Sequence, residues 1–401
     1  MTTTYKDPSR FDPPTDWVNA HSLYLCRSRM NLNPSQVKAL SGIEEETLVN
    51  WEKSIEVPTL EDLEKLAKHY RCPVGYFFLE QPPELLINKV NFRGLLENKV
   101  DSLSYESRLK IDEFIYLSDT LSSIVNDLRV TNSPDVTRIH LNDNIKDIVR
   151  QERELFSFSD AIRKDWESPG EAFDFWKQAI EKRGVYIISL GLIVNEVRGA
   201  SRWEDGSPPT ILVNKNDYES ATGRTFTLLH EWAHLMLREP GIICDFIGSQ
   251  KEAKVERFAN EFAAEMMVGK DELREFLGSK HMDRYKSRWG DSDIDMIKNY
   301  FKVSRDVIVI SLETMDFAPR GFYETKRAQW DSRRPYFSGL PPPRILGRTK
   351  VKRRYGELGG PYSRLLTEAY ISSNISMTSL SKVLGMKIEK VNDFINYVKT
   401  N

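Results

Sequence analysis

The chain has 401 residues, of which 40% are hydrophobic, 29% charged and 11% aromatic, and its formal net charge is −2 at pH 7. This is the composition of an ordinary soluble globular protein, and the small net charge gives the chain as a whole no electrostatic preference for nucleic acid. No stretch approaches the roughly 18 consecutive apolar residues of a membrane span, and the polar N-terminal residues contain no apolar signal segment.

Residues 17–80 are expected to form several short helices. Asn33 and Pro34 predict the start of one helix, because Asn is a favoured N-cap and Pro is favoured at the first helical position. Gly42 permits a tight turn before the next helix, and Thr59 is the expected N-cap of an amphipathic third helix. The order of these elements resembles the XRE-type helix-turn-helix domain of many phage and bacterial repressors. The residues that carry this resemblance are Arg27, Gln36, Gly42, Trp51, Glu52, Pro58, Leu63 to Ala67, Phe77 and Phe78.

The helix that would enter DNA in such a domain begins with three glutamates, Glu44, Glu45 and Glu46. Carboxylates repel phosphates, and three of them together are hard to place in a groove even though one glutamate can accept a hydrogen bond from cytosine. The candidate DNA contacts in this domain are Asn50 and Lys53. The alternative interpretation is a helical domain kept for protein contact or dimerisation.

The next segment, residues 83–156, is interpreted as a helical connector. A Pro-containing stretch from Glu80 to Gly94 leads into a long helix within residues 103–130, and a further helical segment is expected at residues 157–183. Short β-rich runs, VYIISL from Val185 and PTILVN from Pro209, then predict strands of a small sheet.

The stretch TFTLLHEWAHLML, Thr225 to Leu237, carries the strongest chemical signal. Positions four apart share one face of an α-helix, so His230 and His234 can bind one metal ion, and their imidazole nitrogens suit zinc. Glu231 is rotated by one position and can act as a general base on a water molecule without being a ligand. The alternative is two ordinary histidines, but the helix is apolar nearly all round, and buried histidines need partners.

Catalytic zinc keeps three protein ligands, so a third ligand is expected downstream. The helix predicted at residues 250–268 has Glu256 at the border of its apolar stripe, where the carboxylate can reach a metal held by a neighbouring helix. Glu252 also borders the stripe and is the alternative ligand. Asn260, one turn beyond Glu256, is expected to hydrogen-bond a ligand histidine from behind.

Four motifs in a fixed order resemble the ImmA/IrrE family of zinc metallopeptidases. They are Val197 to Ser201, Pro209 to Asn214, Arg224 to Leu237 and Glu256 to Val268. The last motif departs from the family, which usually ends it with Met-Pro, whereas this chain reads Met267-Val268-Gly269. The resemblance implies a zincin-like fold, with zinc held by His230, His234 and Glu256 and with Glu231 as the base.

The resemblance also implies a regulatory task, namely cleaving or antagonising a partner repressor of phage, mobile-element or stress-response genes. Members fused to an XRE-type domain also occur beside toxin genes, where they are thought to act as antitoxins. The alternative function is therefore a DNA- or toxin-binding regulator that uses the metallopeptidase fold as a binding module.

The C-terminal part, residues 319–401, is interpreted as a basic linker followed by a small helical domain. Ser304 is the expected N-cap of the helix that precedes it. Residues 333–360 form a Pro/Gly-rich basic stretch, typically a solvated loop, that can contact nucleic acid or an acidic partner. Residues 362–398 have a second helix-turn-helix pattern, with Gly385 at the expected turn. The candidate DNA contacts here are Arg348, Lys350, Lys352, Arg353 and Arg354.

The sequence therefore predicts an α+β, mostly helical protein. Its expected parts are an all-α helix-turn-helix domain (1–82), the connector (83–156), a zincin-like metallopeptidase domain (157–318) and a small helical C-terminal domain (319–401). The substrate is expected to lie as an extended strand along the edge of the small sheet, with Ile211 to Asn214 as the candidate neighbour, and Arg224 is a candidate for stabilising the oxyanion.

The expected partner is a protein, either a repressor or a toxin, with DNA as a second candidate, no membrane, and a homodimer left open. Cys26, Cys72 and Cys244 are too few and too scattered for a disulfide framework. We accordingly expect a cytoplasmic protein with reduced thiols.

Overall fold

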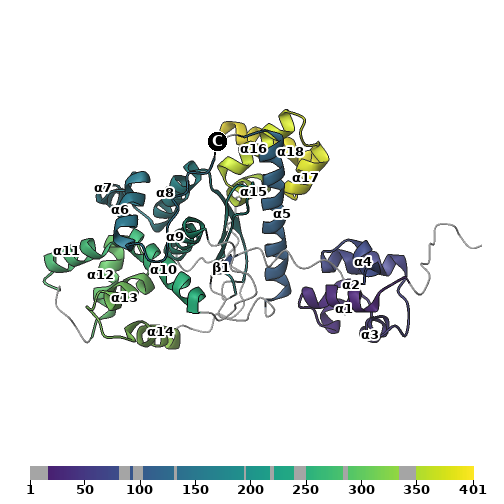
Figure 1. The fold of residues 1–401 in the computed structure, drawn as a ribbon, viewed down its shortest axis with the longest axis horizontal. Coiled ribbons are helices and arrows are strands. Elements are labelled where there is room, and N and C mark those ends of the chain that lie inside the picture. Colours follow the sequence, from purple (N-terminus) through teal and green to yellow (C-terminus); the bar gives the residue numbers. More distant parts are fainter. Residues whose placement is uncertain are drawn as a thin grey trace, which may run out of the picture. The chain divides into compact units, whose positions relative to one another are not determined.

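A computed structural model gives the fold, in which helices predominate around one small sheet (Figure 1). It describes residues 17–80, 91–93, 103–130, 133–193, 196–216, 221–238, 250–282, 288–333 and 349–401. These residues form two compact units, one from Met1–Asn88 with Leu95–Glu113 and one from Lys89–Gly94 with Phe114–Asn401. The boundaries expected at residues 156 and 318 both fall inside the second unit. Within the described ranges, no helix is long and apolar enough to cross a membrane.

In the residues that the structure describes, the first unit is all-helical, as predicted. Its elements are α1 (Ala20–Arg29), α2 (Pro34–Ser41), α3 (Glu45–Glu52), α4 (Leu60–Tyr70) and the 3-10 helix η1 (Val74–Phe78). Asn33 caps α2 and exchanges hydrogen bonds with Gln36, and Thr59 caps α4. Gly42 ends α2 with a φ of +76°, a left-handed conformation that favours glycine.

A charge pair in this unit joins helices α1 and α3. Arg27 of α1 donates two hydrogen bonds, of 2.6 and 2.8 Å, to the carboxylate of Glu52 in α3, which gives two of the residues behind the helix-turn-helix resemblance a structural role. Cys26 and Cys72 are both buried here as free thiols, while Cys244 lies outside the described residues.

The sheet of the second unit has strands β1 (Asn91–Arg93), β2 (Tyr186–Leu190), β3 (Gly199–Arg202) and β4 (Thr210–Asn214) in the order β1-β3-β4-β2. β2 and β4 run parallel, whereas β3 is antiparallel to both β4 and β1. The two apolar strands match the predicted runs, but β1 and β3 were not predicted as strands. Because β4 lies inside the sheet, the expectation that a substrate strand pairs with Ile211 to Asn214 was wrong.

Helices α8 (Pro169–Lys182) and α9 (Ala221–Leu237) pack against the strands. The other helices up to residue 333 are α5 (Tyr105–Asp127), which begins in the first unit, α6 (Ile145–Leu155), α7 (Asp160–Asp165), α10 (Gln250–Met267), α11 (Lys270–Ser279), α12 (Asp291–Phe301), α13 (Arg305–Thr314) and α14 (Phe322–Arg333). The single segment expected at residues 157–183 is split into α7 and α8, because Ser168 caps a new helix with Pro169 at its first turn. Ser304 caps α13 as predicted.

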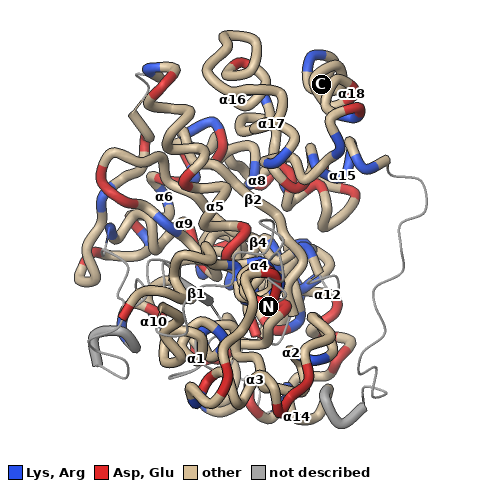
Figure 2. The backbone as a smooth tube through the Cα atoms, turned by 90° about the vertical axis from the view of Figure 1, so that its right-hand side faces the viewer, with Lys and Arg blue, Asp and Glu red and all other residues tan. Residues whose placement is uncertain are grey.

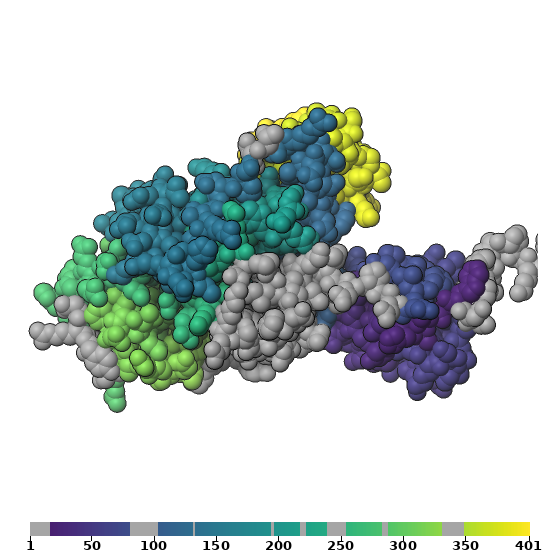
Figure 3. Space-filling model, in the orientation of Figure 1, coloured from purple at the N-terminus to yellow at the C-terminus, as the bar shows by residue number. Residues whose placement is uncertain are grey.

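The C-terminal helices pack on the same unit. They are α15 (Lys350–Leu358), α16 (Gly360–Ile371), α17 (Met377–Leu384), the 3-10 helix η3 (Ile388–Lys390) and α18 (Val391–Thr400). Tyr362 donates a 2.7 Å hydrogen bond to the carbonyl of Leu117 in α5, and Figure 3 shows the C-terminal helices in yellow against the blue of that helix. The basic stretch was expected to be a loop, but residues 350–358 form a helix that Thr349 caps.

A buried charged network joins α6, α9 and the start of the sheet. Glu152 of α6 is fully buried and accepts hydrogen bonds from Arg183 (2.6 Å), Thr137 (2.6 Å) and the indole of Trp232 (3.0 Å). The Arg183 guanidinium also lies 5.0 Å from the centre of the Trp232 ring. Trp232 stands between the two histidines of α9 in the sequence, so this network anchors the helix that carries the predicted chemistry.

We expect Glu152→Ala to destabilise the second unit by about 3–5 kcal/mol, because it removes one partner of a buried ion pair and leaves the charge of Arg183 poorly compensated. The matched control is Arg150→Ala on the same helix, where the 2.9 Å pair with Asp147 is exposed and contributes at most about 1 kcal/mol. Urea unfolding of the two variants measures the difference, and equal losses would contradict the anchoring role.

Candidate metal centre

Helix α9 is buried on almost every side because it packs against α8, α10, β3 and β4. His230 and Glu231 are both fully buried, and the side chain of His234 is 9% exposed. The apolar residues around them explain why the sequence of this helix is hydrophobic nearly all round. Three polar side chains on one turn of such a helix are unusual and need a chemical reason.

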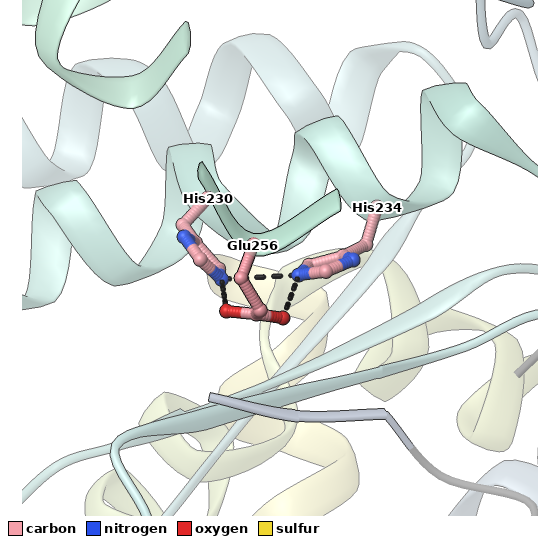
Figure 4. A group of neighbouring side chains, drawn as sticks. All are labelled: His230, His234 and Glu256. Atoms are coloured by element: carbon pink, nitrogen blue, oxygen red, sulfur yellow. Dashed lines mark hydrogen bonds and ion pairs between the residues drawn. The ribbon is translucent and has the colours of Figure 1, made fainter. Parts of the chain in front are cut away.

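Helix α10 packs along α9 and brings a further polar side chain to the same place. The Oε2 of Glu256 lies 3.4 Å from His230 Nε2, and its Oε1 lies 3.2 Å from His234 Nε2. The two histidine Nε2 atoms are 3.0 Å apart. Figure 4 shows the two rings converging on the carboxylate. The three residues are thus brought together as the sequence predicted, with one donor atom from each within 4.8 Å of the others.

These distances fit the donor set of a metal ion. Ligand bonds of about 2.0–2.1 Å in a tetrahedron place neighbouring ligand atoms about 3.3–3.4 Å apart, close to the spacings found here. A cation between the two Nε2 atoms, which face each other at 3.0 Å, can take a lone pair from each imidazole. His230, His234 and Glu256 therefore fit a metal with two nitrogen ligands and one oxygen ligand.

The electrostatics keep Glu256 in the form that a metal needs. Burial alone raises the pKa of this carboxyl group, but hydrogen bonds and charge from His230 and His234 outweigh burial and hold the pKa well below its usual range. Glu256 is consequently an ionised carboxylate at neutral pH. Its side chain is also the most exposed of the three, at 41%, so the group opens to solvent on the Glu256 side.

Glu231 lies between the metal-ligand pair and the sheet. A Cβ added to Gly199 in β3 would come within 3.1 Å of Glu231 Oε1 and within 2.3 Å of the Thr227 side chain. Only glycine lets the strand backbone approach α9 this closely. In the sequence, the only sign of this role is the place of Gly199 in the Val197–Ser201 motif.

Two expectations about the surroundings do not hold, and a third falls on a side chain outside the described residues. Asn260 is exposed and, among the described residues, makes no hydrogen bond to either histidine, because it lies one turn on toward the outer face of α10. The guanidinium of Arg224 stacks over the ring of Phe173 at 4.9 Å instead of joining the three ligands. The side chain of Glu252, the alternative ligand, lies outside the described residues.

The candidate DNA contacts of the first unit lie at the unfavourable end of α3. Asn50 donates a 3.2 Å hydrogen bond to Glu56, and Lys53 is the C-cap of the helix. A recognition helix reads bases mainly with its N-terminal residues. That end of α3 carries Glu44 to Glu46, and Glu44 pairs with Lys38 at 2.7 Å.

The candidate DNA contacts of the C-terminal part fall into three groups. Lys350, Lys352 and Arg353 are exposed on α15. Arg354 is buried, donates to Glu357 at 3.1 Å and to the carbonyl of Val383 at 2.8 Å, and so joins helices within the domain. This contradicts its assignment as a surface contact. Arg348 lies outside the described residues.

One part of the chain matches a known protein family. Residues 180–313 match the family described as IrrE N-terminal-like domain, Peptidase_M78. The matched segment contains β2 to β4, α9 and α10, and therefore the whole of the His230, His234 and Glu256 group. No curated protein and no solved structure matches the chain. The second unit therefore contains, at residues 180–313, an IrrE N-terminal-like domain of the M78 peptidase family.

Proposed function

We propose that this protein is a zinc-dependent endopeptidase that acts on a regulatory protein partner. The observation that carries the proposal is the group of His230, His234 and Glu256 next to the buried Glu231, inside a domain of a peptidase family. Two imidazoles and one carboxylate are a common ligand set of catalytic zinc, which keeps one further position open for chemistry.

Each residue of the site then has a role. His230, His234 and Glu256 would hold the zinc ion, which would polarise the carbonyl of the scissile bond and lower the pKa of water. Glu231 takes a proton from the attacking water and passes it to the leaving amine. Gly199 keeps β3 close to Glu231, and the Glu152 network holds α9 in place, so the base is fixed before substrate arrives.

The substrate is an extended segment of a protein. β3 borders Glu231 but is paired on both sides, with β4 and with β1. A substrate strand can therefore join the sheet beside the site only in place of β1. The partner that best suits the helix-turn-helix and metallopeptidase resemblances is a repressor or a toxin in a phage, mobile-element or stress circuit, which places the protein in the cytoplasm.

The first test of this proposal is metal content. Purified protein is expected to hold about one zinc ion per chain, and His230→Ala should lose most of it, since two remaining ligands bind zinc weakly. His140→Ala, which changes an exposed histidine, is the control and should keep its zinc. Elemental analysis of the three proteins decides the matter, and equal zinc in wild type and His230→Ala would end the assignment.

The second test separates an enzyme from a binding module. Glu231→Gln should keep zinc and thermal stability near wild type while proteolysis falls about 10²- to 10⁴-fold, because the base is lost and the ligands remain. Glu275→Gln, an exposed carboxylate on α11, is the matched control. The measurements are the partner protein that co-purifies with Glu231→Gln, its cleavage by wild type, and a reporter of regulation in cells. A Glu231→Gln protein that regulates normally would favour the binding-module function.

A second candidate function is DNA binding by the C-terminal helices. Helix α17 ends at Gly385 in a left-handed turn with a φ of +57°, and α18 follows as the second helix. Residues 349–401 contain nine Lys or Arg and four Asp or Glu, which gives a net charge of +5. Residues 17–80 contain seven Lys or Arg and nine Asp or Glu, which gives a net charge of −2. Figure 2 places several of these cations along α15. Positive charge of this kind supports phosphate binding.

We expect the full chain to bind duplex DNA in a salt-dependent manner through this region. Replacing Lys350, Lys352 and Arg353 with Ala should weaken binding and reduce the slope of log K against log salt by about 1 for each phosphate that is no longer neutralised. The control is the triple replacement of Lys53, Lys65 and Lys68 in the first unit, which should change little. A loss of binding confined to the control would move the DNA-binding surface to the N-terminal domain.

A further inference from the structure

Helix α6 bonds to both helices that carry the metal group, through two consecutive residues of opposite charge. Glu152 accepts a 3.0 Å hydrogen bond from the indole of Trp232 in α9. Arg153, the next residue, reaches α10 instead. Its guanidinium donates a 2.9 Å hydrogen bond to the carbonyl of Glu265 and bonds of 3.0 and 3.2 Å to the carbonyl of Met266. One turn of α6 is therefore tied to α9 and to α10 (Figure 1).

The bonds from Arg153 act on the backbone of α10. Glu265 and Met266 belong to its last turn, and the last four carbonyl groups of an α-helix have no partner within the helix. A planar guanidinium can satisfy two such carbonyls at once, and its positive charge is favourable at the C-terminal end of the helix dipole. Because backbone carbonyls move with the whole helix, these bonds fix the position of α10 itself.

Arg153 is held from its other side by α11. It donates a 2.6 Å hydrogen bond to Glu272, whose second carboxylate oxygen accepts a 2.7 Å bond from the buried Arg163 of α7. Gly269 makes room for this arrangement, since a Cβ at that position would lie 2.8 Å from Glu272 Oε2 and 3.2 Å from Arg153 Nη1. The guanidinium is thus a fixed support for the end of α10.

The relative position of α9 and α10 decides whether the metal group forms. His230 and His234 lie on α9, whereas Glu256 lies on α10 and meets their Nε2 atoms at 3.4 and 3.2 Å. Metal–ligand bonds allow a spread of only about 0.2 Å. A small slide of one helix along the other would therefore take the carboxylate of Glu256 out of the ligand set.

We infer that Arg153 is a positioning residue for the metal centre. Together with Glu152 it makes α6 a brace that sets the spacing of α9 and α10, and so the distances between the histidines and Glu256. Met266 is ten residues after Glu256, about 15 Å along the helix, so Arg153 acts through α10 and not on the metal directly. The inference rests on the proposed function, since the metal centre of that function is the site that the brace serves.

The test compares two Arg→Lys variants at the same carboxylate. In Arg153→Lys the ammonium group keeps the charge and can pair with Glu272, but it has no planar fork with which to hold the carbonyls of α10 as well. Arg163→Lys makes the matched change at the other arginine bonded to Glu272, which among the described residues makes no hydrogen bond to α10. Competition with a chelator measures the zinc affinity of each full chain, at a temperature where circular dichroism shows that every variant is folded.

We expect Arg153→Lys to weaken zinc binding about tenfold and Arg153→Ala to weaken it up to about a hundredfold, the scale on which residues that orient metal ligands act. Arg163→Lys should bind zinc as the wild type does, even where it lowers the Tm as much as Arg153→Lys. With saturating cobalt in place of zinc, the visible absorption of Arg153→Lys should also differ from that of the wild type. A loss of stability alone leaves the spectrum of the loaded, folded protein unchanged.

Equal zinc affinity and equal cobalt spectra in Arg153→Lys and the wild type would overturn the brace and leave the proposed function standing. An equal loss of affinity in the two lysine variants would also overturn it, because the loss would then come from Glu272 or from general stability. If Arg153→Ala does not fold, the two lysine variants decide. A wild-type protein that binds no zinc would overturn the proposed function and the brace together.

Discussion

The need to satisfy polar groups inside a buried helix organises the second unit. α9 buries His230 and Glu231 completely, and buried polar groups must be paired or bind a metal. The surrounding elements meet this need from two directions. α10 supplies the carboxylate of Glu256 to the histidines, and Glu152 of α6 accepts a hydrogen bond from the indole of Trp232. Removing either one would leave charge or hydrogen-bonding capacity in an apolar core.

The sequence predicts those features that depend on neighbours in the chain. Helix caps at Asn33, Thr59 and Ser304 follow from local hydrogen bonding, and the pairing of His230 with His234 follows from helical period. Glu256 could also be placed, because the phase of the apolar stripe puts it at the edge of the interface. The same phase argument failed for Asn260, which is one turn further but rotated toward the exposed outer face of α10.

The features that could not be predicted from the sequence depend on contacts between distant segments. β1 and β3 are short and gain their identity only by pairing with each other and with β4. The basic residues before Gly359 read as a loop, yet the burial of Val351, Arg354 and Leu358 on one face makes them a helix. The partners of Glu152 lie 15 to 80 residues away, so no local pattern indicates that this carboxylate is buried.

The geometry of the site limits which proteins can be substrates under the proposed function. A segment that takes the place of β1 must be extended and have free backbone donors and acceptors, a condition met by linkers and termini but not by residues inside a helix or sheet. This condition favours a partner with an exposed linker. Selectivity then comes from how accessible that segment is in the partner, and a regulator can control cleavage by ordering or releasing it.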